Sequence, residues 1–245
     1  MDGFDSVQWP ITTSHRILDT RNTYVEMAKE TECTHLLFLD PDMEPDVEVG
    51  HDAQALPFFD TSWRFIQQVA NGQVERLPSG SLAVVGAPAT SGPPDFKINV
   101  FPSDDDGNIY QHSPLDVIEK KGHFERVAAV GTALMLIPME AFDLIEPPYF
   151  DDLYTDQKKC GVSQSQDVYF CLKCADKGIS IWCNWYSWAR HYKTIGLDRP
   201  TRAVMEYMET SSRTRKILGD TVNENRDCSI DKPCVPQIFG SEVAV

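Results

Sequence analysis

Apolar and polar residues follow one another along the chain in blocks that predict an α/β fold. Four consecutive apolar residues at 36–39 are typical of a parallel strand buried on both faces of a sheet, and residues 82–87 form a second such run. Helical spacing and end signals predict helices over residues 19–29, 61–70 and 167–177. Since strands and helices alternate, the pattern indicates a sheet with helices packed on its faces.

Weaker patterns complete the predicted domain. Residues 97–101, 124–138 and 179–182 contain further strands, and Pro138 opens a short helix that runs to residue 145. Three Asp residues and a glycine at 104–107 predict a solvated turn. Residues 200–218 form a last amphipathic helix, after which the pattern fades into a loose tail. We therefore expect one domain over residues 1–200, with a helix and tail at 201–245 packing on it.

The strand at 36–39 ends on two carboxylates, Asp40 and Asp42, separated by Pro41. Open α/β sheets bind ligands at the carboxyl ends of their strands, where both Asp side chains are expected to lie. Two close carboxylates repel each other, and the pKa of one rises, unless a cation lies between them. Their oxygens suit Mg²⁺ or Mn²⁺. The alternative is a turn in which the Asp residues only cap the next element.

Composition and charge narrow the classes of protein. A net charge of −15 argues against a large sequence-independent hold on DNA or RNA. No apolar run approaches the roughly 18 residues that span a bilayer, and the first residues lack the features of a signal peptide. We therefore expect no transmembrane segment and a cytoplasmic location.

The seven cysteines are an odd, scattered set, which favours reduced thiols over a disulfide framework. Cys171 and Cys174, with Cys183 further along, also allow a zinc site in an interaction module. Against this, the first pair lies in an apolar helical pattern, and no second Cys-x-x-Cys follows.

The order of several motifs resembles the GT-A glycosyltransferases, especially the inverting family-2-like group. This chain has Thr-Arg-Asn at 20–22, Leu-Phe-Leu-Asp-Pro-Asp-Met at 37–43, Gly-Thr at 131–132, Gln-Asp-Val-Tyr-Phe at 166–170 and Arg-His-Tyr at 190–192. Similar sequences read Ala-Arg-Asn, Leu-Phe-Leu-Asp-x-Asp-Met, Gly-x-Gly, Glu-Asp-x-x-Phe and Gly-His in the same order. The match spans residues 19–193, and it implies a GT-A-type (Rossmann-like) mixed sheet flanked by helices.

The resemblance implies a role for each matching residue on the donor side. Asp40 and Asp42 form the Asp-x-Asp motif, with Asp42 on the metal and Asp40 at the ribose or acting through water. His191 completes the metal shell, since a neutral imidazole also binds such cations. Arg21 meets the nucleotide or its diphosphate. Gly131 and Thr132 lie beside the sugar, where a missing side chain lets the backbone approach.

On the acceptor side, the resemblance makes Asp167 the general base that takes a proton from the acceptor hydroxyl. The preceding residue is Gln166 where relatives have Glu, so the contact made by this neighbour differs from the family pattern. Asp167 as a helix cap and His191 as a structural histidine are the simpler alternatives. Trp182, Trp185 and Trp188 either stack on a sugar or belong to the core.

The resulting hypothesis is a metal-dependent glycosyltransferase that uses Mn²⁺ or Mg²⁺ and a nucleoside-diphosphate-sugar donor, with UDP as the first choice of nucleotide. It transfers a hexosyl or related group to an acceptor hydroxyl with inversion. The acceptor is a glycan, lipid, protein, small molecule or modified nucleic-acid base, because acceptor loops vary freely on this scaffold. The alternatives are a retaining transferase and an inactive sugar-nucleotide-binding protein.

The start of the chain departs from the family pattern. The family opens with a strand and helix that bind the nucleotide base, whereas only eighteen residues precede Asp19 here. Residues 7–10 are the one candidate for this opening strand. The inactive binding protein is favoured if this short segment lacks base recognition.

Overall fold

The computed structural model describes residues 17–91, 97–151 and 165–192 of the 245-residue chain. The expected strand at 7–10, the helix at 200–218 and the tail to residue 245 lie outside the described residues.

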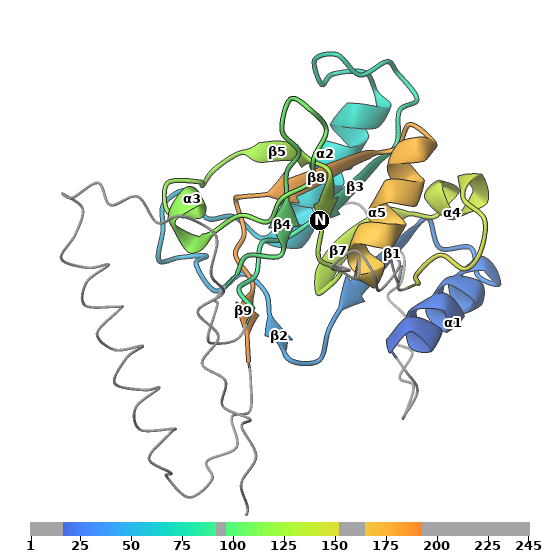
Figure 1. The fold of residues 1–245 in the computed structure, drawn as a ribbon, viewed down its shortest axis with the longest axis horizontal. Coiled ribbons are helices and arrows are strands. Elements are labelled where there is room, and N and C mark those ends of the chain that lie inside the picture. The colour runs from blue at the N-terminus through green and yellow to red at the C-terminus, as the bar shows by residue number, and fades with distance from the viewer. Residues whose placement is uncertain (1–16, 92–96, 152–164, 193–245) are drawn as a thin grey trace, which may run out of the picture. The chain divides into compact units, whose positions relative to one another are not determined.

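A mixed five-stranded sheet forms the centre of the described fold (Figure 1). Its strands follow the order β1 (His35–Leu39), β7 (Leu134–Pro138), β3 (Ala83–Gly86), β8 (Ser180–Asn184) and β5 (Phe124–Val127). Strands β3 and β8 are parallel, while β1 with β7, β7 with β3, and β8 with β5 are antiparallel. The prediction of an α/β fold with helices flanking a sheet is therefore confirmed.

Strand β1 corrects one expectation. Within the described sheet it is an edge strand, and its neighbour β7 runs antiparallel to it, with Leu39 opposite Leu134. Of its five residues only Phe38 is buried, whereas Leu39 is 36% exposed. The apolar run arises because both faces of β1 are covered, with Phe38 in one apolar cluster and Leu37 beside the other. An apolar run indicates that both faces of a strand are covered, but it does not indicate whether the neighbouring strand is parallel or antiparallel.

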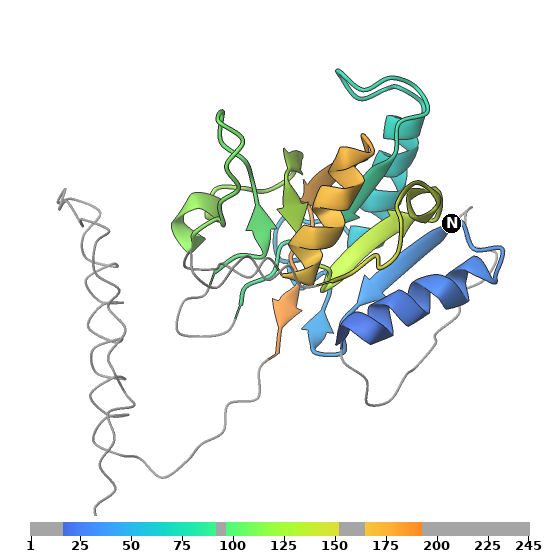
Figure 2. The same ribbon diagram turned by 45° about the vertical axis from the view of Figure 1, so that its right-hand side comes forward.

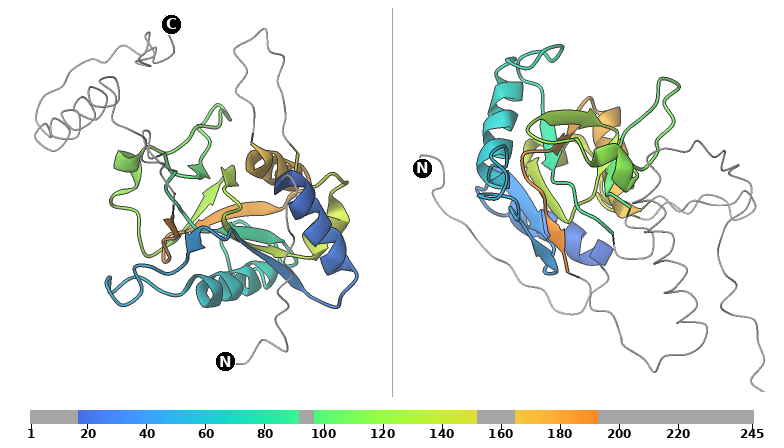
Figure 3. Two further views of the ribbon diagram at one scale, coloured as in Figure 1. Left: turned by 90° about the horizontal axis from the view of Figure 1, so that it is seen from below. Right: turned by 90° about the vertical axis from the view of Figure 1, so that its left-hand side faces the viewer.

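Helices cover both faces of the sheet (Figure 3). On one face pack α1 (Ile17–Lys29), α4 (Glu140–Leu144) and α5 (Gln166–Asp176), and on the other packs α2 (Phe58–Ala70). Successive residues of a strand serve opposite faces, as the pleat requires: Val84 joins the α5 side, while Ala83 and Val85 join the α2 side. The result is a three-layer arrangement with an apolar cluster on each side.

The predicted helix ends agree closely with the structure. Helix α5 begins after Ser165 and ends before Gly178, which has a φ of 78° and so occupies the left-handed region that glycine favours. The helix predicted at 61–70 begins earlier, at Phe58, because Phe58 supplies a fully buried ring to the α2 side. The short helices α3 (Pro114–Val117) and α4 complete the set in the described residues.

Two short ribbons flank the sheet. Strands β2 (Met43–Glu44) and β9 (Arg190–His191) pair antiparallel, and so do β4 (Val100–Phe101) and β6 (Ala129–Val130). The first ribbon joins the segment after β1 to a segment about 150 residues further along (Figure 2). These ribbons bring the loops with the predicted site residues together.

The predicted turn at 104–107 is confirmed. Asp104 accepts hydrogen bonds from the backbone nitrogens of Asp106 and Asn108, so the acidic segment is a turn. Cys33, Cys171, Cys174 and Cys183 are free thiols, and burial raises the pKa of Cys171 to about 12. No helix in the described part of the chain is long and apolar enough to cross a membrane.

Candidate functional site

The two carboxylates that follow β1 lie in a tight turn. The Asp40 nitrogen donates to the carbonyl oxygen of Ala133 at 2.9 Å, and the Met43 nitrogen donates to the Asp40 carbonyl at 3.0 Å. The first bond continues the pairing of β1 with β7 by one residue, while the second turns the chain back into β2. Asp40 and Asp42 therefore emerge at the end of the strand, as the sequence pattern predicts.

His191 contacts Asp42 because strand β9 pairs with β2. Met43 lies opposite His191 in this ribbon, and the Tyr192 nitrogen donates to the Asp42 carbonyl at 2.8 Å. The side chains then meet, with 3.0 Å between His191 Nε2 and Asp42 Oδ2. The two residues, 149 positions apart in the sequence, are therefore in contact, while their predicted role as ligands of one metal ion stays a prediction.

The orientation of the His191 ring suits a metal ligand. Its Nδ1 lies 3.1 Å from the carbonyl oxygen of Thr90, which can only accept, so Nδ1 carries a hydrogen and Nε2 faces Asp42. Such an outer hydrogen bond typically orients a metal-binding imidazole. Two ligands at right angles on an octahedral cation, each about 2.1 Å from it, lie about 3.0 Å apart. The 3.0 Å separation of Oδ2 and Nε2 matches that spacing and equally matches a direct hydrogen bond or ion pair between the two side chains.

The donor set is incomplete without ligands from elsewhere. Within the described ranges, no group of three or more His, Cys, Asp and Glu side chains is arranged to hold a metal ion. Asp42 and His191 supply two ligands of the right chemical type, while the remaining positions would belong to water or to donor phosphates. Mg²⁺ and Mn²⁺ sites of this kind commonly use few protein ligands, so the pair fits such a cation.

Arg21 links Asp40 with Asp167. Its Nη2 lies 3.1 Å from both Asp40 oxygens, and its Nη1 lies 2.9 Å from Asp167 Oδ1. The predicted contact of Arg21 with a nucleotide stays a prediction, but its partners here are protein carboxylates. Burial raises the pKa of Asp40 above its usual value, while the Arg21 guanidinium opposes that rise.

Asp167 lies in the first turn of α5, but its side chain contacts other segments. The residue that precedes the helix is Ser165, and Asp167 Oδ1 accepts from both Arg21 and the Thr132 hydroxyl, the latter at 2.6 Å. Thr132 is completely buried. A purely helix-capping role does not require these two partners, so Asp167 also links α5 to Arg21 of α1 and to Thr132 of the loop after β6.

Gly131 packs closely against Asn99, a residue that the sequence pattern did not identify as important. A Cβ atom at position 131 would lie 2.5 Å from Asn99 Nδ2. Asn99 in turn accepts a hydrogen bond from the Ala89 nitrogen at 2.6 Å, and its carbonyl accepts from the Gly131 nitrogen at 2.7 Å. Asn99 therefore joins the loops that follow β3 and β6. The structure thus gives Gly131 a packing reason in addition to its predicted place beside a sugar.

Replacing Gly131 with Ala should destabilise the fold by about 1–3 kcal/mol, because the new methyl group overlaps the Asn99 side chain. Thermal or urea unfolding would measure the loss. The double variant with Asn99→Ala should be less destabilised than the sum of the two single variants, since the 2.5 Å contact with Nδ2 is then removed and only the 2.9 Å contact with the Asn99 Cβ remains. Additive effects would contradict this account.

The tryptophans near the site belong mainly to the core. Trp182 packs edge-on against Phe65, with ring centroids 4.9 Å apart. Trp185 is 4% exposed and donates its Nε1 hydrogen to Glu125 Oε2 at 2.8 Å. Trp188 is partly buried beside Trp185, with centroids 6.0 Å apart. These contacts favour the core interpretation over stacking on a sugar, most clearly for Trp185.

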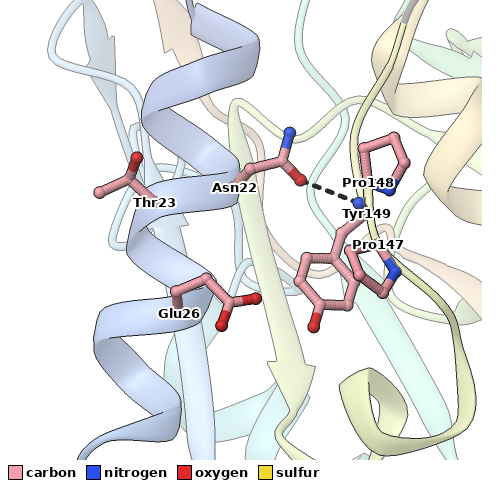
Figure 4. A pocket seen from close by; sticks show the side chains of 6 residues that line it. All are labelled: Asn22, Thr23, Glu26, Pro147, Pro148 and Tyr149. Carbon is pink, nitrogen blue, oxygen red and sulfur yellow. Dashed lines mark hydrogen bonds between the residues drawn. The ribbon is translucent and has the colours of Figure 1, made fainter.

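The structure also has a surface pocket of about 530 Å³ (Figure 4). It is lined by Asn22, Thr23, Glu26, Pro147, Pro148 and Tyr149. Asn22 is committed to the adjacent backbone, since its Oδ1 accepts from the Tyr149 and Phe150 nitrogens and its Nδ2 donates to the Phe150 carbonyl. None of the predicted site residues lines this pocket. The carboxylates and the imidazole that could bind a cation or accept a proton lie instead around Asp42 and Asp167, so this cluster is the better candidate for the functional site.

The position of Arg21 on the apolar face of α1 is a sequence signal for its ion pairs with Asp40 and Asp167. Leu18, Arg21 and Val25 are the buried residues of α1, at the spacing of one helix face. An arginine in an apolar stripe requires a buried carboxylate partner. The pattern therefore indicates an ion pair at this position, although it does not name Asp167.

Comparison with protein-family models and with curated protein sequences finds no match. Among solved structures, the chain is similar to the crystal structure of A197 from STIV, with a TM-score of 0.45 and 16% sequence identity. The similarity covers 78% of this chain and 82% of that chain. A likeness at this level does not define a family.

Proposed function

We propose that this protein is a metal-dependent glycosyltransferase of the GT-A type. It moves a hexosyl or related group from a nucleoside-diphosphate-sugar, with UDP as the first choice, to an acceptor hydroxyl with inversion. The observation that supports this proposal most is that the motif residues, which are far apart in the sequence, lie close together in the structure. Arg21, Asp40 and Asp167 share one set of ion pairs, Thr132 bonds Asp167, and Asp42 meets His191.

Each part of the cluster has a chemical task in this proposal. Asp42 and His191 would hold Mn²⁺ or Mg²⁺, which when bound neutralises charge on the leaving diphosphate. Asp40 contributes negative charge beside this pair, while Arg21 balances it. Gly131 and Thr132 form the backbone beside the sugar.

Asp167 acts as the general base. Arg21 and Thr132 both bond Oδ1, and within the described residues no hydrogen bond reaches Oδ2. Oδ2 is therefore the atom that accepts the hydroxyl proton as the oxygen attacks the anomeric carbon. Because Oδ1 is held from two sides, the carboxylate has one orientation, which reduces the entropic cost of the reaction.

Calorimetric titration with UDP, GDP, CDP and TDP, with and without Mn²⁺, tests the donor site. We expect one nucleotide to bind in a metal-dependent way and the others to bind weakly or not at all. Asp60→Asn is a suitable control for variants of the site carboxylates, because Asp60 is an exposed carboxylate of α2 that pairs only with Arg64 among the described residues. Absence of metal-dependent binding to every nucleotide would contradict the proposal.

Product analysis separates the related alternatives. An inverting enzyme yields a glycoside of the anomeric configuration opposite to that of the donor, whereas a retaining enzyme keeps it. Metal-dependent binding without transfer to any acceptor or to water would instead identify an inactive sugar-nucleotide-binding protein.

A further inference from the structure

Arg21 is exceptional among the charged residues of this fold. It is the one Lys, Arg, Asp or Glu residue that is buried among residues 17–91, 97–151 and 165–192, with 4% of its surface exposed. Charged side chains are rarely buried without partners. A buried guanidinium on the inner face of α1 therefore requires a specific electrostatic reason.

The partners of Arg21 occupy both ends of its guanidinium. Nη2 lies 3.1 Å from each Asp40 oxygen, and Nη1 lies 2.9 Å from Asp167 Oδ1. The group also lies 6.0 Å from the centroid of the Phe38 ring. Arg21 therefore holds two carboxylates, one in the turn after β1 and one in α5, that are 127 residues apart (Asp167 minus Asp40). A diphosphate could replace these partners only if these partly buried ion pairs were broken.

We propose that Arg21 is the positioning residue of the site: it fixes Asp40 and Asp167 relative to each other and does not touch the donor diphosphate. This inference rests on the proposed function for the roles of the two carboxylates. Arg21 directs Oδ1 of Asp167 inward together with Thr132 and leaves Oδ2 for the acceptor proton. It also occupies both oxygens of Asp40, so the cation ligands from this turn come from Asp42.

Lysine cannot replace this function, because a single ammonium nitrogen does not reproduce the planar fork that grips two carboxylates. Arg21→Lys keeps the charge and loses the geometry, whereas Arg21→Gln loses both. The two variants therefore separate charge from position. Arg64→Gln provides a matched control, since Arg64 is an exposed arginine that pairs with Asp60 one helical turn away.

Binding of UDP and UMP in the presence of Mn²⁺ tests whether Arg21 touches the diphosphate. If it does not, the ratio of the UDP and UMP affinities should stay within about twofold of the wild-type ratio in Arg21→Gln. A charge-assisted contact to the second phosphate would instead make that ratio fall by about tenfold or more. Such a fall would overturn the inference.

Release of UDP from UDP-glucose, with water as acceptor, tests the effect on Asp167. We expect kcat to fall by about 100-fold in Arg21→Gln with KM nearly unchanged, because a displaced base costs rate and not donor affinity. Arg21→Lys should lie between Arg21→Gln and the wild type. A rise in KM with kcat unchanged would place Arg21 on the donor and contradict a positioning role.

A thermal double-mutant cycle keeps the inference testable if the proposed function fails. Arg21→Gln combined with Asp167→Asn, and separately with Asp40→Asn, should show non-additive shifts in Tm, since each pair shares an ion pair. Wild-type protein that binds no nucleotide would count against the proposed function, whereas additive shifts would count against Arg21 as the link. Circular dichroism confirms that each variant is folded.

Discussion

Asp167→Asn should reduce the rate of sugar transfer by about 10²–10⁴-fold while leaving metal-dependent nucleotide binding intact. Asparagine has nearly the same shape as aspartate, and its oxygen can still accept from Arg21 and Thr132 at the position of Oδ1. Its NH₂ group then replaces Oδ2 and cannot accept a proton. The loss would therefore arise in the chemical step.

The measurement combines initial rates of UDP release with calorimetry on the same protein preparation. Asp176→Asn is the matched control, since Asp176 is an exposed carboxylate at the other end of α5. Full activity in Asp167→Asn would remove the general-base assignment. A large loss of nucleotide binding in the same variant would instead indicate that Asp167 acts on the donor.

Asp42→Asn and His191→Ala should each weaken Mn²⁺-dependent nucleotide binding by at least about 100-fold. Their side chains supply Oδ2 and Nε2 at the 3.0 Å spacing of adjacent metal ligands. Asp40→Asn should weaken binding less, because both Asp40 oxygens already bond Arg21 and would contribute mainly charge. Comparison of Asp40→Asn with Asp42→Asn thus shows which carboxylate of the Asp-x-Asp motif contributes more to Mn²⁺-dependent binding.

Titration of Mn²⁺ and UDP, followed by calorimetry, measures this ranking, with Asp60→Asn as the neutral reference. Equal losses for Asp40→Asn and Asp42→Asn would mean that both carboxylates bind the cation. Unchanged binding in His191→Ala would leave His191 as a structural partner of Asp42, the simpler interpretation of this residue.

Much of the fold follows from local pattern. The helices near 19–29, 61–70 and 167–177 are present with shifts of a few residues, and the apolar run at 82–87 contains a fully buried strand. Helix periodicity, terminal glycines and runs of apolar residues act over a few neighbours, so the chain carries them wherever it folds. The Asp-x-Asp turn at the end of β1 belongs to the same class of information.

Local sequence patterns do not predict which strands are neighbours in the sheet or which distant side chains contact each other. Strand β1 pairs antiparallel with β7 and not with a parallel strand, and Asn99 occupies the space beside Gly131. Neither contact leaves a periodic signal, because each depends on how two distant segments cross. For Arg21, the resemblance implied a contact with the nucleotide or its diphosphate, which stays a prediction, and local pattern did not name its protein partners in this structure, Asp40 and Asp167.

Residue type and local spacing alone indicate that Asp40 and Asp42 follow an apolar strand and that residues 19–29 form a helix, since both depend on neighbouring residues. Only the tertiary structure places Asp167 against Arg21, 146 residues away, and His191 against Asp42, 149 residues away. The physical reason is that electrostatic and hydrogen-bond partners are selected by distance in space, which the path of the whole chain sets.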